Sequence, residues 1–140
     1  MSETPGWQHL ITLDVDGFPA TFATAREAEW KRVVTAACER WAATTPPRVT
    51  AAFRYAVEID FRLGPSRHAG ETWDLDNLIK PTLDAMIPVF GPRQWSGPLQ
   101  PQDDLVDRLQ AEKRQPADGE QPGATITVHV RPATQLGTPG

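Results

Sequence analysis

The chain has 140 residues, a length that fits one domain, and 39% of them are hydrophobic, which is enough for one ordinary core. No apolar run approaches the roughly 18–20 residues of a membrane-spanning helix, and the first residues lack the pattern of a signal peptide, so we expect a soluble, cytoplasmic protein. A single cysteine, Cys38, excludes an intramolecular disulfide and a cysteine-based zinc cluster, and the net charge of −4 argues mildly against a nucleic-acid partner.

The first half of the chain predicts a strand, a helix and a second strand. Residues 8–14 alternate loosely between apolar and polar side chains and predict the first strand. Thr24, with Glu27 three residues later, has the pattern of a capping box that starts an amphipathic helix. We expect Cys38 to be a buried, small apolar side chain in this helix. Residues 53–63 alternate almost without exception and form the clearest strand in the sequence.

The second half of the chain predicts a helix, a long loop and two closing strands. Residues 75–87 carry one apolar stripe, and Pro81 requires that this helix either begins near Lys80 or kinks at the proline. Residues 88–102 contain four prolines and two glycines and predict a long loop. Residues 104–113 and 124–131 are typical of a pair of strands around an Asp118-Gly119 turn, although the first of them also suits a helix.

The predicted order is β-α-β-α-β-β, an α+β fold in which two helices pack on one mixed sheet. This domain covers residues 7–131. The tails, residues 1–6 and 132–140, are polar or rich in proline and glycine, and we expect them to be disordered.

The segment that carries chemical information is WDLDNLIKPTLDAM, followed about twenty residues later by QDD. Asp74 and Asp76 flank the predicted helix entrance, and Asp76, Lys80 and Asp84 fall on one edge of the helix, away from its apolar stripe. A strand packed against this helix would bring the Asp103–Asp104 pair to the same point. Clustered carboxylates repel one another and need a cation unless they are protonated or paired. Oxygen ligands with no His or Cys nearby favour Mg²⁺ or Mn²⁺ over zinc.

Two readings of these acids are possible from residue types and spacing. In the functional one, a bound Mg²⁺ supports hydrolysis of a phosphodiester, and Lys80 stabilises charge on the phosphate. In the structural one, Asp76 or Asn77 caps the helix, Asp76 pairs with Lys80, and the other acids are solvated. Seven of the 18 acidic residues lie in the two stretches 71–84 and 103–107, so metal binding there would leave the rest of the chain mildly basic.

The string DLDNLIKPTLDAM, the loop that follows, the aspartate pair and VDRLQAEKR together resemble the RusA family of Holliday junction resolvases, over roughly residues 50–131. The resemblance implies a homodimer that cuts four-way DNA junctions symmetrically, with Mg²⁺ at each acidic site. It implies functional roles for Asp74, Asp76, Lys80 and one of Asp103 or Asp104. A non-catalytic relative that binds branched DNA or metal, and a small interaction protein with solubilising acids, are the alternatives.

The chain departs from the family pattern at three points. The gap between DLDN and QDD is longer, the spacing after the aspartate pair is one residue shorter, and the Pro-Pro-Ser opening is missing. The second departure leaves open whether Asp103 or Asp104 is the ligand. Candidate contacts to DNA phosphates are Arg67 and His68 in the loop before the acids, and Lys113 and Arg114 at the end of a strand.

Overall fold

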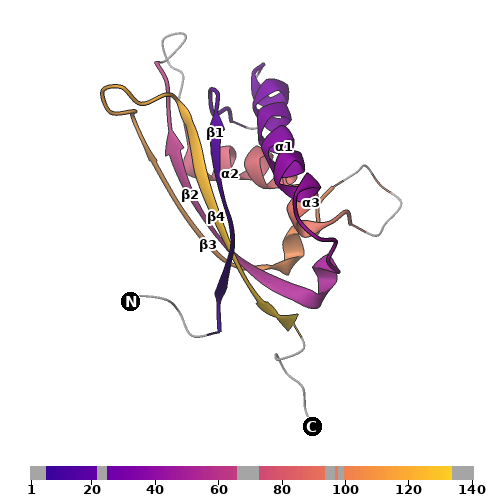
Figure 1. The fold of residues 1–140 in the computed structure, drawn as a ribbon. Coiled ribbons are helices and arrows are strands. Elements are labelled where there is room, and N and C mark those ends of the chain that lie inside the picture. Colours follow the sequence, from indigo (N-terminus) through magenta and orange to yellow (C-terminus); the bar gives the residue numbers. More distant parts are fainter. Residues whose placement is uncertain (1–5, 22–24, 66–72, 94–96, 98–99, 134–140) are drawn as a thin grey trace.

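The computed structural model describes residues 6–21, 25–65, 73–93, 97 and 100–133, which form one sheet with helices packed on it (Figure 1). The predicted α+β class and element order are confirmed, with a short third helix added. The elements in chain order are β1 (Gln8–Asp16), α1 (Glu27–Ala43), η1 (Thr50–Ala52), β2 (Phe53–Arg62), α2 (Leu75–Asp84), α3 (Ile87–Phe90), η2 (Asp103–Leu105), β3 (Val106–Arg114) and β4 (Gly123–Pro132); η1 and η2 are single 3₁₀ turns.

The sheet is mixed and has the strand order β1-β4-β2-β3. β4 is antiparallel to both of its neighbours, whereas β2 and β3 are parallel. The expected pairing of the last two strands is therefore wrong, because β2 lies between them. Burial explains the order: alternate residues of β4 are buried along its whole length, which suits a central strand, whereas β3 is exposed at most positions, which suits an edge.

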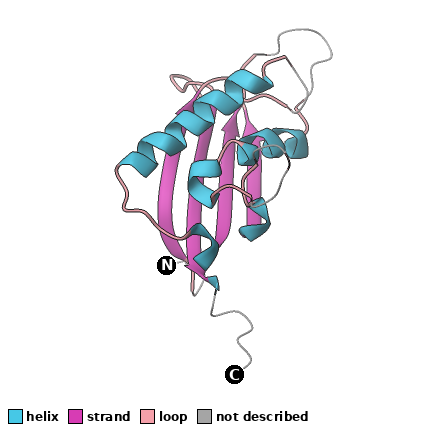
Figure 2. Cartoon of the chain, turned by 90° about the vertical axis from the view of Figure 1, so that its right-hand side faces the viewer, coloured by secondary structure: helices cyan, strands magenta, loops and turns pink. Residues whose placement is uncertain are grey.

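The helices lie on the same face of the sheet, and no described helix covers the opposite face, called here the uncovered face (Figures 1 and 2). β1 and β2 are both antiparallel to β4 and hence parallel to each other, so the connection through α1 is a crossover, as is the connection from β2 to β3. Successive crossovers of one hand that move in one direction across a sheet place their helices on the same side.

The core lies between this sheet and the helices. Its largest fully buried side chains include Trp30 of α1, Tyr55 and Phe61 of β2, and Phe90 of α3. The indole N–H of Trp30 donates a hydrogen bond to Thr82 Oγ1 over 2.9 Å and joins α1 to α2. Cys38 is buried as expected, and its desolvation raises the pKa of the thiol to about 12.

Both main helices differ in detail from their predicted bounds. α1 begins at Glu27, with Arg26 at the N-cap position, so the predicted helix start at Thr24 is wrong. Thr24, on which the predicted capping box depends, lies outside the described residues. α2 begins at Leu75, not near Lys80, and Pro81 is accommodated inside it. The helix ends at Asp84, and the chain continues as α3, which places Ile87–Phe90 in a helix at the start of the predicted loop.

The sequence also predicted disordered tails and no membrane-spanning helix. Residues 1–5 and 134–140 of the predicted tails lie outside the described residues. Among the helices that the structure describes, none is long and apolar enough to cross a membrane.

Gly123, at the start of β4, is expected to tolerate no side chain. A Cβ atom there would lie 1.9 Å from the carbonyl oxygen of Val15 in β1. Because backbone cannot move aside cheaply, we expect Gly123→Ala to lower the free energy of unfolding by about 3 kcal/mol in urea denaturation. Gly119→Ala is the control: at φ +84° it is strained, but nothing lies within 4 Å, so the cost is about 1 kcal/mol. An equal loss from both substitutions would contradict the close approach of β4 to β1.

Candidate functional site

The start of α2 presents two aspartates. Asp74 occupies the N-cap position, but its side chain makes no capping bond to the helix. Asp76 lies in the first turn, where one carboxylate oxygen accepts a hydrogen bond from the backbone N–H of Asn77 over 3.0 Å. Both residues are exposed. This end of α2 therefore offers carboxylate oxygens to solvent.

Lys80 and Asp84 lie further along α2 and form an ion pair. Lys80 Nζ is 3.4 Å from Asp84 Oδ2, with the lysine side chain 54% exposed and the aspartate 20% exposed. The structural interpretation of the acids expected Asp76 or Asn77 to cap the helix, whereas the N-cap residue is Asp74. The Lys80–Asp84 ion pair is exposed, and an exposed ion pair contributes little to the stability of the fold. The Lys80 ammonium group therefore lies at the surface of α2, in contact with solvent.

Lys113 joins the end of β3 to the start of α2. Its ammonium group donates a hydrogen bond to the backbone carbonyl of Trp73, the residue before Asp74. This contact places a second lysine beside the aspartates of α2. Arg114, the next residue, points to the other side of the sheet and pairs with Asp60 and Glu120, at 3.4 Å and 2.7 Å.

Two of the basic candidates lie outside the described residues: Arg67 and His68, which the sequence suggested as contacts to DNA phosphates.

The Asp103–Asp104 pair lies in η2, immediately before β3. Arg93 holds it: the Arg93 guanidinium is 2.8 Å from a carboxylate oxygen of Asp103 and 3.7 Å from one of Asp104. Because Val106 and Lys113 are separated by seven residues of strand, roughly 23 Å, the pair and the start of α2 lie toward opposite ends of β3. Within the part of the chain that the structure describes, no group of three or more His, Cys, Asp or Glu side chains is arranged to hold a metal ion.

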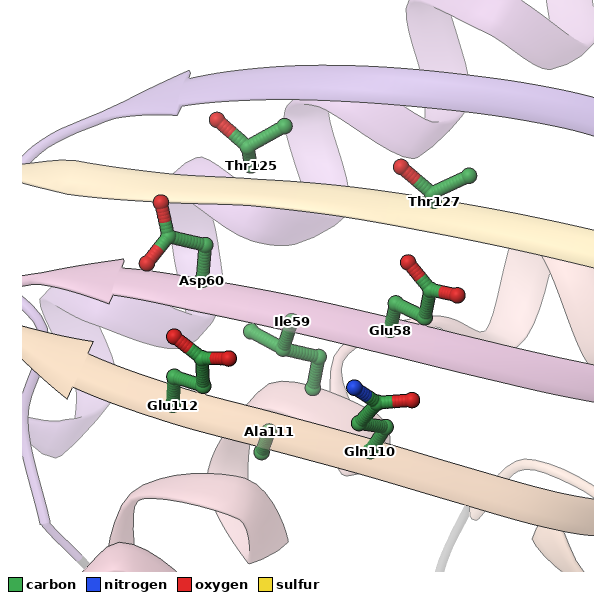
Figure 3. Close-up of a pocket in the computed structure, with 8 residues that line it drawn as sticks. All are labelled: Glu58, Ile59, Asp60, Gln110, Ala111, Glu112, Thr125 and Thr127. Carbon is green, nitrogen blue, oxygen red and sulfur yellow. The ribbon is translucent and has the colours of Figure 1, made fainter. Parts of the chain in front are cut away.

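The structure shows another acidic group that sequence reasoning missed. Glu58, Asp60 and Glu112 stand on the uncovered face of the sheet, where they line a hollow of about 270 Å³ with Gln110, Thr125 and Thr127 (Figure 3). Ile59 and Ala111, also labelled in Figure 3, point to the opposite face. The alternation of β2 and β3 was visible in the sequence, but the pairing of Asp60 with Glu112 depends on β3 lying beside β2.

Several arginines neutralise acids on this face. Arg62 is buried; it pairs with Asp14 at 3.0 Å and donates to the hydroxyl of Thr125. At the other end of the face, the hydrogen bond from Arg54 lowers the pKa of Asp107, with smaller contributions from charge attraction to Arg54 and Arg131. Asp107 belongs to the acidic stretch 103–107, and this pairing removes it from the candidates for metal binding.

The ion pair between Arg114 and Glu120 predicts how the stability of the fold depends on pH. The hydrogen bond from Arg114, and then that from the backbone N–H of Ala117, lower the pKa of Glu120 to about 2. A depressed carboxyl pKa stabilises the fold above the unfolded-state pKa, and that contribution disappears as pH falls toward 2. We expect an NMR titration of the Glu120 carboxyl carbon to have its midpoint near 2, and a midpoint near the ordinary value in Arg114→Gln. An ordinary midpoint in the unsubstituted protein would contradict the ion pair between Arg114 and Glu120.

Comparisons with known proteins assign no family to this arrangement. No protein-family model matches the chain, and no curated protein matches it either. The resemblance to the RusA family rests on the sequence motifs of α2, η2 and β3.

Proposed function

We propose that the chain is a Mg²⁺-dependent endonuclease that cuts four-way (Holliday) junctions or related branched DNA as a homodimer. One observation carries the proposal. Asp74 and Asp76 are exposed together at the start of α2, with Lys80 one turn further along and Lys113 tied to the carbonyl of Trp73. Two carboxylates flanked by two lysines suit a divalent ion and the phosphate that it would share with the protein.

The donor atoms at this place fit Mg²⁺. The ligands are carboxylate oxygens, and Mg²⁺ commonly binds through one or two carboxylates while water and substrate phosphate complete its coordination. Asp74 and Asp76 are therefore a sufficient contribution from the protein. When bound, such an ion polarises the phosphoryl group and lowers the pKa of a coordinated water. Lys80, released from Asp84, would stabilise negative charge on the phosphate.

The Asp103–Asp104 pair has a less direct place in the proposal. The resemblance assigns one of the two aspartates a role in metal binding. In the single chain, both aspartates lie in η2 and form ion pairs with Arg93. Single Asp→Asn substitutions at 103 and 104 test this role: loss of cleavage in one variant assigns the role to that aspartate, and cleavage kept in both leaves the ion to Asp74 and Asp76.

Charge indicates which side of the protein meets DNA. The uncovered face of the sheet carries Glu58, Asp60 and Glu112 around its hollow; Arg114 pairs with Asp60, and the carboxylates of Glu58 and Glu112 repel phosphates. The side that carries α2 presents Lys80 and, at the edge of the sheet, Lys113. We place the DNA on the helical side, across the start of α2 and the neighbouring end of β3.

Cleavage of a synthetic four-way junction tests the proposal. With Mg²⁺, the protein is expected to introduce paired nicks in strands of like polarity, because two sites related by a two-fold axis act on one junction. Absence of nicks with both Mg²⁺ and Mn²⁺ would contradict the proposed activity.

A non-catalytic protein that binds branched DNA is the second candidate. It is favoured by the ion pairs of Arg93 with Asp103 and Asp104, which satisfy these acids without a metal. The two candidates differ in a gel-shift experiment run beside the cleavage assay: a retarded junction that stays intact in several divalent metals supports the binding protein.

A further inference from the structure

A second hollow, of about 310 Å³, lies between the end of α1 and the start of α3. It is lined by aromatic, proline and hydroxyl side chains around one arginine, including Trp41, Thr45, Pro46, Arg48, Thr50 and Pro88. Its volume is at the small end of the range for ligand pockets. None of its lining residues belongs to the proposed metal site.

Arg48 is a half-buried cation whose contacts leave its charge uncompensated. Its guanidinium lies 5.0 Å from the ring centroid of Trp41 and 5.9 Å from that of Tyr55, and it donates to the carbonyl of Val89 and the hydroxyl of Tyr55. Its Nε is buried and has no hydrogen-bond partner among the residues that the structure describes. No ion pair joins Arg48 to a carboxylate of the described residues. An anion entering the hollow would therefore gain a charge interaction that the protein itself does not use.

We propose that this hollow binds one nucleotide of an unpaired DNA strand, with its phosphate against Arg48 and its base against Trp41 and the neighbouring prolines. Proteins that bind single strands combine positive charge along the backbone with aromatic side chains on which bases stack. The inference rests on the proposed function for its choice of DNA as the ligand, and it extends the DNA contact to a place away from α2.

The position of the hollow agrees with this role. Thr50 lines it, and the Thr50 hydroxyl lies 3.4 Å from the side-chain nitrogen of Gln102, the residue before Asp103. A DNA strand with one nucleotide bound in the hollow would therefore pass close to η2 and the Asp103–Asp104 pair. The hollow lies on the helical face of the sheet, the side on which we place the DNA.

Fluorescence anisotropy with a labelled thymidine octamer, at low salt and in EDTA, tests the proposal without metal or cleavage. We expect Trp41→Leu to weaken binding about 5- to 150-fold, the range found for loss of one stacking platform. Arg48→Lys should weaken it at least about fivefold, because lysine does not reproduce the stacked, planar guanidinium. Arg40→Gln is the matched control: this exposed arginine in the last turn of α1 is outside the lining, and its loss should change affinity less than about threefold.

Thermal unfolding of each variant identifies proteins that fail to fold, and photocrosslinking of the unsubstituted protein gives an independent result. An octamer that contains 5-bromodeoxyuridine should crosslink to the peptide that carries Trp41. Equal effects of Arg48→Lys and Arg40→Gln, or crosslinks confined to other segments, would overturn the proposal. Thymidine 5′-monophosphate is the comparison ligand. If the protein binds it more tightly than the octamer, the ligand of the hollow is a free nucleotide and not a DNA strand. A protein that binds the octamer through Trp41 but cuts no junction keeps this inference and loses the proposed nuclease activity.

Discussion

Replacing Asp76 with Asn is expected to lower Mg²⁺-dependent cleavage of a four-way junction by at least about 100-fold. The substitution keeps the size of the side chain and removes the charge that would hold the ion, and metal catalysis contributes several kcal/mol to stabilisation of the transition state. Asp76 is exposed at the start of α2, so the free energy of unfolding should change little. Single-turnover cleavage and a gel shift in EDTA separate lost chemistry from lost binding.

Glu112→Gln is the matched control for this experiment. Glu112 is also an exposed acid, but it lies on the uncovered face of the sheet, away from α2. Its loss is expected to leave the cleavage rate within about threefold of the original, since one surface charge alters DNA association only through the overall field. Unchanged cleavage by Asp76→Asn, or equal loss in both variants, would remove the metal site from the start of α2.

Trp30→Ala is expected to lower the free energy of unfolding by about 3–5 kcal/mol, the largest loss of stability that we predict for one substitution. Trp30 is 1% exposed, and its indole N–H bonds the Thr82 hydroxyl of α2. The substitution therefore leaves a cavity and removes the hydrogen bond between α1 and α2. Urea denaturation measures the effect, and cleavage should fail at a lower temperature because α2 carries the proposed site.

Trp30→Phe separates these two contributions. Phenylalanine fills most of the space but cannot donate to Thr82, so the expected loss is about 1–2 kcal/mol. A loss of less than about 1 kcal/mol in Trp30→Ala would contradict the burial of this side chain between α1 and α2.

Local sequence patterns predicted the helices and strands of this fold better than they predicted which strands pair in the sheet. The alternation of residues 53–63 and the apolar stripe of residues 75–87 each depend on one face of one element, and both elements are present. The expected hairpin depended on which strands pair. β4 pairs with β1 and β2 because its buried alternate residues need cover from the core, and that requirement involves the whole sheet.

In the candidate site, too, residues of one helix could be predicted to lie together, whereas residues from separate elements could not. Asp74, Asp76 and Lys80 lie within seven residues, so the geometry of one helix brings them together. The convergence of Asp103 and Asp104 with them depended on how β3 is placed relative to α2. The contact of Lys113 with Trp73 puts the far end of β3 at the start of α2, and a non-local contact of this kind leaves no periodic signal in the sequence.

The proposed activity depends most on where a divalent ion binds, and NMR spectra recorded during titration with Mn²⁺ locate that ion directly. Paramagnetic broadening is expected first at the backbone amides of Asp74, Asp76 and Asn77, with loss of this effect in Asp76→Asn. Broadening centred on Glu58, Asp60 and Glu112, while the amides of α2 stay sharp, would contradict the account.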